Sequence, residues 1–200
     1  IVSETGSQPD DDLQFVSDGV INLLFREEER KINISKIRGS GFQKGYHTYV
    51  LDKKGMTVYP KFSNKTLRKE VKRKNNEKIS SGVPEIDKLL HGGLERGTNT
   101  IITGPTGSGK TSLGLNFMKE AAGRGERSVV YLFEENKEVL LKRFEAINIP
   151  VERMVEKNSL ELFSIDQLNL SPEIFIHQVK NEVERNDTDI VMIDSVTSFS

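Results

Sequence analysis

Residues 104–111 read Gly-Pro-Thr-Gly-Ser-Gly-Lys-Thr, which has the residue types and spacing of a phosphate-binding P-loop. Glycines let backbone N–H groups curl around phosphate oxygens, and a helix that begins at Lys110 adds partial positive charge. In such a loop Lys110 reaches the β- and γ-phosphates of a nucleotide, and Thr111 ligates Mg²⁺. A plain glycine-rich turn is the competing interpretation, but the complete motif between a predicted strand and a predicted helix disfavours it. The nucleotide-binding candidates are Gly104, Pro105, Thr106, Gly107, Ser108, Gly109, Lys110, Thr111 and Ser112.

Three carboxylates follow apolar runs that have the composition of strands. Asp194 ends the run 190–193, the pattern of a Walker B aspartate that holds Mg²⁺ through its water shell. Glu134 and Glu135 follow the run 128–133. Parallel strands present their carboxyl ends to the ligand, so one of these glutamates can polarise the water that attacks a γ-phosphate while the other supports it. The residues alone leave an equal alternative, in which both glutamates only favour the start of the next helix.

Strands and helices alternate from residue 79 onward, and these elements must position the candidate residues. The apolar runs predict strands at 98–103, 128–133, 160–164 and 190–193, of which 128–133 is expected to be buried. Helical spacing predicts helices at 111–122, 137–147 and 172–185, the last with Ser171 as its cap and Pro172 at its first position. This alternation predicts an α/β domain with a mostly parallel sheet flanked by helices.

The first 60 residues have a different pattern, with short strands predicted at 20–25, 31–37, 47–51 and 56–59. A hairpin turn at 52–55, where Gly55 supplies a positive φ, predicts antiparallel pairing. Lys36 and Arg38 lie at the end of one of these strands, where such residues more often form a solvated edge. Residues 63–78 are rich in Lys and Arg and are interpreted as a solvated basic linker. They lack the interleaved aromatic side chains on which the bases of a single-stranded nucleic acid would stack.

The composition of the 200-residue chain excludes several classes of protein. Lys and Arg number 29 against 30 Asp and Glu, so the chain is not generally basic and we expect no nucleic-acid partner. The absence of cysteine excludes disulfides, thiolate metal sites and a cysteine nucleophile, and it fits a cytoplasmic location. No apolar run approaches the length of a bilayer span. The first residue is Ile1, and we expect both ends to continue into a longer protein.

Several of these motifs together resemble a KaiC-type domain of the RecA superfamily. Residues 79–94, Ile-Ser-Ser-Gly-Val-Pro-Glu-Ile-Asp-Lys-Leu-Leu-His-Gly-Gly-Leu, followed by the P-loop, are similar to the start of such a domain. Phe133-Glu134-Glu135 resembles its paired catalytic glutamates, and Ile193-Asp194-Ser195 resembles its Walker B end. Residues 16–21 and 36–40 are similar to the closing part of a preceding KaiC domain.

This resemblance implies a division of the chain into residues 1–62, the end of a first RecA-like domain, the linker 63–78, and residues 79–200, the front of a second. It also implies a homo-oligomeric, hexameric ring that binds ATP and Mg²⁺ between neighbouring subunits. Lys36 and Arg38 match a family pair that acts on the neighbour's ATP. One departure is that Ser40-Gly41-Phe42 stands where the clock members have a histidine, so any role of that histidine does not carry over.

The activity that the resemblance implies is ATP hydrolysis, with Glu134 and Glu135 as catalytic residues. A Ser/Thr autokinase of the circadian-clock type is the main alternative, with signalling proteins as partners. A RadA-like DNA-acting recombinase is a lesser alternative. Residues 3–17 stand where RecA proteins carry a DNA-binding loop, and their acidic character disfavours contact with DNA. A non-enzymatic scaffold, in which the nucleotide only fixes the oligomer, uses the same binding residues and stays open.

Overall fold

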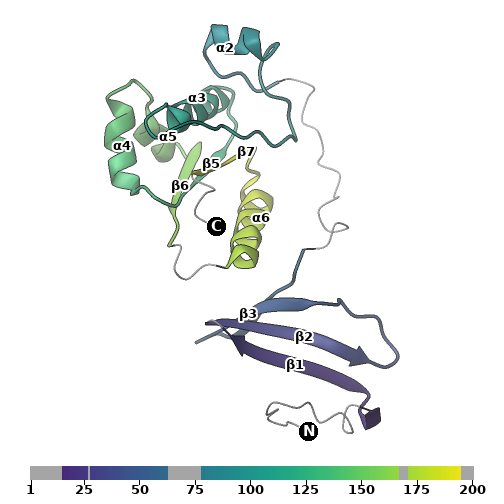
Figure 1. The fold of residues 1–200 in the computed structure, drawn as a ribbon. Coiled ribbons are helices and arrows are strands. Elements are labelled where there is room, and N and C mark those ends of the chain that lie inside the picture. The colour runs from purple at the N-terminus through teal and green to yellow at the C-terminus, as the bar shows by residue number, and fades with distance from the viewer. Residues whose placement is uncertain (1–14, 27, 63–77, 167–170, 195–200) are drawn as a thin grey trace. The chain divides into compact units, whose positions relative to one another are not determined.

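The computed structural model describes residues 15–26, 28–62, 78–166 and 171–194, which belong to two compact units. One unit contains an antiparallel sheet and the other a parallel sheet with helices (Figure 1). The chain is therefore a mixed α/β protein, as the alternation of elements predicts. The predicted linker 63–78 lies outside the described residues, except for Lys78.

The antiparallel sheet is a meander in which each strand pairs with the next one along the chain. Its strands are β1 (Gly19–Arg26), β2 (Glu29–Ile37), β3 (Tyr46–Asp52) and β4 (Gly55–Tyr59), in that spatial order. The four strands and the hairpin at 52–55 are confirmed. Asp52 pairs with Gly55, whose φ of 108° is the positive value that the tight turn needs.

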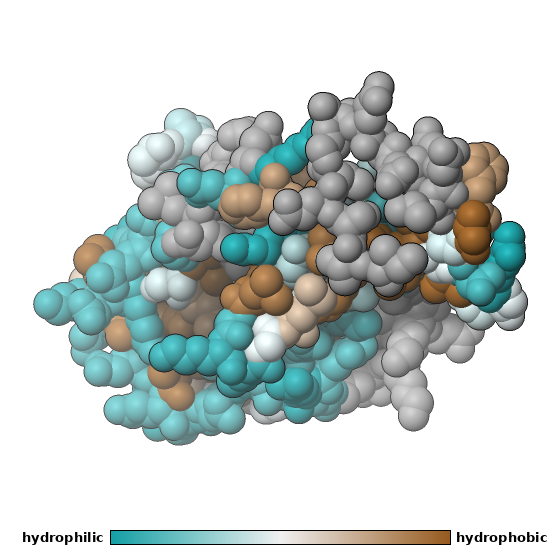
Figure 2. All heavy atoms as spheres, turned by 90° about the horizontal axis from the view of Figure 1, so that it is seen from below, coloured by the Kyte–Doolittle hydropathy of each residue, from teal (hydrophilic) through white to brown (hydrophobic). Residues whose placement is uncertain are grey.

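One face of this sheet carries exposed apolar side chains. Cross-strand pairing places Leu23 opposite Ile32 and Leu51 opposite Met56, so apolar residues meet across both hairpins. Leu23, Phe25 and Leu51 are each more than half exposed. Figure 2 shows such hydrophobic side chains, in brown, among hydrophilic ones on the face seen from below. This sheet therefore leaves apolar surface in contact with solvent.

The parallel sheet has three strands in the order β6-β5-β7. Every residue of the central strand is buried, as expected for a strand with neighbours on both edges and helices on both faces. The register places Leu132 beside Ser164 on one side and beside Asp194 on the other, so the carboxyl ends of all three strands lie at one edge. The strands are β5 (Ser128–Leu132), β6 (Leu160–Ser164) and β7 (Ile190–Asp194).

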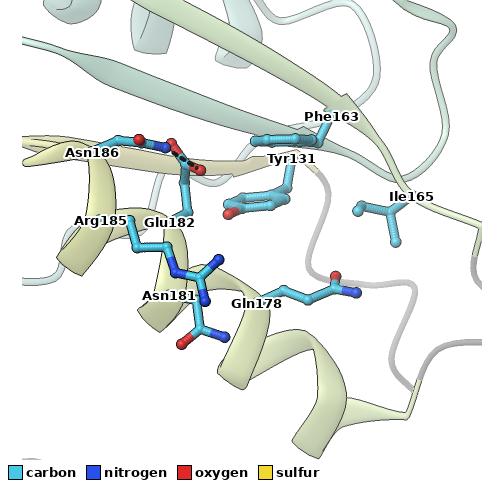
Figure 3. A pocket seen from close by; sticks show the side chains of 8 residues that line it. All are labelled: Tyr131, Phe163, Ile165, Gln178, Asn181, Glu182, Arg185 and Asn186. Atoms are coloured by element: carbon cyan, nitrogen blue, oxygen red, sulfur yellow. Dashed lines mark hydrogen bonds between the residues drawn. The ribbon is translucent and has the colours of Figure 1, made fainter. Parts of the chain in front are cut away.

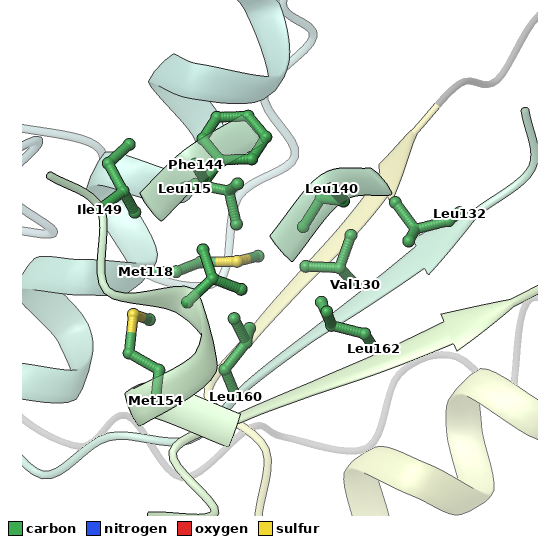
Figure 4. Packing of buried hydrophobic residues seen from close by; sticks show 11 residues of the cluster. Leu115, Met118, Val130, Leu132, Leu140, Phe144, Ile149, Met154, Leu160 and Leu162 are labelled. Carbon is green, nitrogen blue, oxygen red and sulfur yellow. The ribbon is translucent and has the colours of Figure 1, made fainter. Parts of the chain in front are cut away.

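Helices α3 (Lys110–Gly123), α4 (Lys137–Glu145) and α5 (Val151–Glu156) pack on one face of this sheet. Strand residues two apart point to the same face, so Val130 and Leu132 both enter the core that these helices cover (Figure 4). The core consists of Leu115, Met118, Val130, Leu132, Leu140, Phe144, Ile149, Val151, Met154, Leu160 and Leu162.

Helix α6 (Pro172–Asn186) contributes its second half to the opposite face of the sheet. Arg127, directly before β5, binds Glu161 of β6 and Glu182 of α6, the latter at 3.0 Å. Tyr131 stacks on Phe163 with ring centroids 5.3 Å apart. Burial, together with the two glutamates, raises the pKa of Tyr131 to about 12. Figure 3 shows the pocket between sheet and helix, lined by Tyr131, Phe163, Ile165, Gln178, Asn181, Glu182, Arg185 and Asn186.

One predicted strand is absent from the structure, and two short helices are present that the sequence does not predict. The strand predicted at 98–103 is wrong: these residues form no strand, and Ile101 is 85% exposed. An extended segment becomes a strand only when a neighbour completes its hydrogen-bond ladder, and no described residue pairs with this one. Helices α2 (Pro84–Leu89) and α5 have six residues each, too few to display a helical period in the sequence.

Candidate functional site

The loop 104–109 leads directly into helix α3. Gly107 and Gly109 have φ values of 81° and 91°, which non-glycine residues rarely adopt. Ser108 donates its backbone N–H to the carbonyl of Pro105 at 3.2 Å, and this bond closes the turn. A side chain at Gly104 would place its Cβ 2.6 Å from Oγ of Ser108. The glycines are therefore needed for the compact, exposed loop at the start of the helix.

The Lys110 side chain folds back over this loop. Its ammonium donates to the carbonyl oxygens of Gly104 and Pro105, both at 2.9 Å. The structure thus places the only strong positive charge of the P-loop motif beside the backbone that curls around it. A cation and the N-terminus of a 14-residue helix at one loop form an arrangement that attracts phosphate.

Thr111 and Asp194 meet although 83 residues separate them. The Thr111 hydroxyl donates to Oδ2 of Asp194 at 2.7 Å, which joins the start of α3 to the end of β7. A hydroxyl and a carboxylate are oxygen ligands of the kind that Mg²⁺ prefers, so the pair fits this ion. Among the described residues no group of three or more His, Asp or Glu gathers as a metal site. Phosphate oxygens and water would supply the other ligands, as is usual for Mg²⁺.

The glutamate pair lies at the same edge of the sheet. Phe133 continues β5 by one residue, because its N–H donates to the carbonyl of Asp194 at 2.8 Å. Glu134 is therefore one residue beyond a direct backbone link to Asp194. Glu135 follows and forms a two-point ion pair with Arg143 of α4, through distances of 2.7 and 2.8 Å. The structure brings the ends of β5 and β7 and the start of α3 together, as the sequence predicts for one site.

Arg143 is not among the residues predicted from the sequence. It lies eight residues after Glu135, and Glu135 precedes the helix that starts at residue 137, so helical periodicity does not specify their contact. Asn136 caps this helix by accepting a hydrogen bond from the backbone of Glu138 at 3.1 Å. Nothing in the sequence pattern distinguishes Arg143 from the neighbouring Lys142 as the partner of a glutamate.

The segment before the P-loop is fixed by Asp87 of α2. Its carboxylate accepts hydrogen bonds from the Ser80 hydroxyl at 2.5 Å and from the Ser81 hydroxyl and N–H, both at 2.7 Å. These bonds, the Ser80 hydroxyl first, lower the pKa of Asp87. Ile79 and Leu94 form a two-bond bridge that closes the segment. The residues that resemble the start of a KaiC domain therefore stabilise a local turn.

Lys36 and Arg38 lie in the other unit, near the end of β2. Arg38 forms an ion pair with Asp18 at 3.2 Å, and the two side chains are 62% and 82% exposed. The Lys36 ammonium donates to the carbonyl of Phe15 at 3.3 Å. Arg38 is thus exposed, where such an ion pair contributes little to stability, whereas Lys36 is half-buried.

The parallel sheet, the P-loop and the carboxylates at the strand ends define a P-loop nucleotide-binding domain of the α/β class. A family model described as "ATPase: KaiC" matches residues 79–200. The chain therefore belongs to the KaiC ATPase family, and the family resemblance is confirmed.

Curated relatives extend the similarity to 94% of the chain. The chain is 30% identical over 191 residues to the circadian clock oscillator protein KaiC of Picosynechococcus sp.. It is 28% identical to KaiC 1 of Synechocystis sp. and 27% identical to KaiC of Synechococcus elongatus, each over 191 residues. The chain spans 36% of the length of each of these proteins. No helix in the described ranges is long and apolar enough to cross a bilayer.

Proposed function

We propose that residues 79–200 bind Mg-ATP and hydrolyse it. The observation that carries this proposal is the meeting of three elements at one edge of the sheet. Thr111 of α3 bonds to Asp194 of β7 at 2.7 Å, and the backbone of Asp194 bonds to Phe133, next to Glu134. Membership of the KaiC ATPase family supports the same activity.

In the proposed reaction each group has a separate task. The loop N–H groups and Lys110 hold the phosphates, and Thr111 and Asp194 would hold Mg²⁺, which neutralises charge on the β- and γ-phosphate oxygens. The oxygen of water forms a bond to the γ-phosphorus while the bond from phosphorus to the bridging oxygen breaks. The electron pair of that bond leaves with ADP, and the proton of water passes to a carboxylate of the pair Glu134 and Glu135.

The proposal extends to a ring of several copies, in which residues 1–62 end one RecA-like domain and residues 79–200 begin the next. Lys36 and Arg38 would then act on ATP held by the neighbouring subunit. The exposure of Arg38 supports this, since a cation that serves a neighbour must be accessible. A positive side chain stabilises the charge that develops during phosphoryl transfer.

Two variants test binding and turnover separately. Lys110→Ala removes the charge on the phosphates and should weaken Mg-ATP binding at least about tenfold, or ~1.4 kcal/mol, in calorimetry. Changing both Glu134 and Glu135 to Gln should leave binding intact and slow hydrolysis about 10²-fold or more. Equal affinity in the first variant contradicts the binding site, and unchanged hydrolysis in the second contradicts the role of the glutamates.

Phosphate transfer to the protein itself is the second candidate, and the names of the clock relatives favour testing it. With γ-labelled ATP, hydrolysis releases all the label as inorganic phosphate. Label that remains on the protein after denaturation would instead identify a Ser/Thr autokinase.

A further inference from the structure

We propose that Arg143 is a positioning residue that divides the tasks of the glutamate pair. Arg143 holds Glu135 in a supporting role, so that Glu134 takes the proton from the attacking water. This inference rests on the proposed ATP hydrolysis. It concerns a contact between α4 and the end of β5 that the motifs themselves do not contain.

The geometry of the pair is the first argument. Nη1 of Arg143 lies 2.7 Å from Oε1 of Glu135, and Nη2 lies 2.8 Å from Oε2. Both carboxylate oxygens are thus engaged by one planar guanidinium, the fork geometry that fixes orientation as well as charge. The fork occupies one acceptor site on each oxygen, so Glu135 cannot turn to follow an attacking water without breaking both contacts.

The second argument is that the guanidinium has its own support. The guanidinium carbon of Arg143 lies 4.7 Å from the ring centroid of Phe144, which is 1% exposed and part of the core. The ring attracts the cation, so Arg143 is held on one side by the core of the domain and on the other by Glu135. Asn136 caps α4 directly after Glu135 and fixes the backbone between the two partners.

The third argument is electrostatic. Two adjacent carboxylates at the place where a polyphosphate reacts would repel each other and the substrate. The side chains of Glu135 and Arg143 are 22% and 49% exposed, so the pair is partly shielded from water. Pairing with Arg143 offsets the negative charge of Glu135 at this edge of the sheet. Arg143 would therefore affect turnover through Glu135, without touching the reacting atoms.

The experiment measures hydrolysis and affinity for a non-hydrolysable ATP analogue in the full-length protein. Arg143→Gln removes the fork, and Lys142→Gln removes the same charge from the neighbouring exposed position as the matched control. We expect Arg143→Gln to lower kcat roughly 10- to 100-fold, the effect of a misplaced catalytic group, with analogue affinity within about twofold of the parent. Lys142→Gln should retain the parent kcat. Arg143→Lys keeps the charge but not the fork, and should also lower kcat.

A double-mutant cycle separates positioning from a general structural role. If Arg143 acts through Glu135, combining Arg143→Gln with Glu135→Gln should lower kcat no further than the more severe single variant. Glu134→Gln should be the most severe single change. Multiplicative effects in the double variant, or a parent-like kcat for Arg143→Gln, would overturn the inference. A parent protein without ATPase activity would instead refute the proposed function and the inference together.

Discussion

Removal of the Thr111 hydroxyl gives the most direct test of the site, because this group joins two elements and is proposed to ligate the metal. Thr111→Val keeps the shape of the side chain and removes the donor to Oδ2 of Asp194, which lies at 2.7 Å. A hydrogen bond to a charged acceptor contributes about 1.5–3 kcal/mol. Both side chains are half-buried, so we expect the loss in the free energy of unfolding to be near the lower limit, about 1.5 kcal/mol.

The assay compares ATP affinity with and without Mg²⁺. In Thr111→Val the affinity in the presence of Mg²⁺ should fall at least about tenfold, or ~1.4 kcal/mol, while the affinity in EDTA stays at the parent value. Thr111→Ser is the matched control, because it keeps the hydroxyl and loses only the methyl group. If Mg²⁺ raises the affinity for ATP by the same factor in Thr111→Val and in the parent, the assignment of this hydroxyl to the metal is refuted, whatever the effect on stability.

Three further predictions concern stability and assembly. The pKa of Tyr131 is raised from 10.0 to about 12, so the unfolded chain loses the phenol proton at a lower pH than the folded chain does. Between pH 10 and 12 the parent should therefore lose about 2 kcal/mol more of its unfolding free energy than Tyr131→Phe, as measured by denaturant titration. A Cβ at Gly93 would lie 2.2 Å from the carbonyl oxygen of Ile79, whereas Gly97 also has a positive φ but open space. Gly93→Ala should therefore destabilise the chain by about 2 kcal/mol more than Gly97→Ala in thermal unfolding. The proposed ring implies that the full-length protein carries a first domain with a P-loop lysine of its own. Arg38→Ala subunits mixed with subunits that lack that lysine should then regain some first-domain ATPase activity, and no recovery in rings shown to be mixed would argue against action on a neighbour.

The sequence by itself determined the class of fold and the identity of most candidate residues. Residues 104–111 are informative because glycine readily adopts the positive φ values of 81° and 91° found in the loop, which other residues rarely do. The apolar runs before Glu134 and before Asp194 predict parallel strands, and both are present, although only β5 is buried along its whole length. Their common edge follows from the parallel arrangement, and the catalytic and metal-binding roles of these residues stay predictions.

Only the tertiary structure decided which side chains meet and which apolar run forms a strand. The bond between Thr111 and Asp194 spans 83 residues, and no local period specifies such a contact. Arg143 rather than Lys142 pairs with Glu135, because the packing of Phe144 in the core sets the rotation of α4. Residues 98–103 have the composition of a strand but form none, because a strand depends on the hydrogen bonds of a neighbour as well as on its own residues.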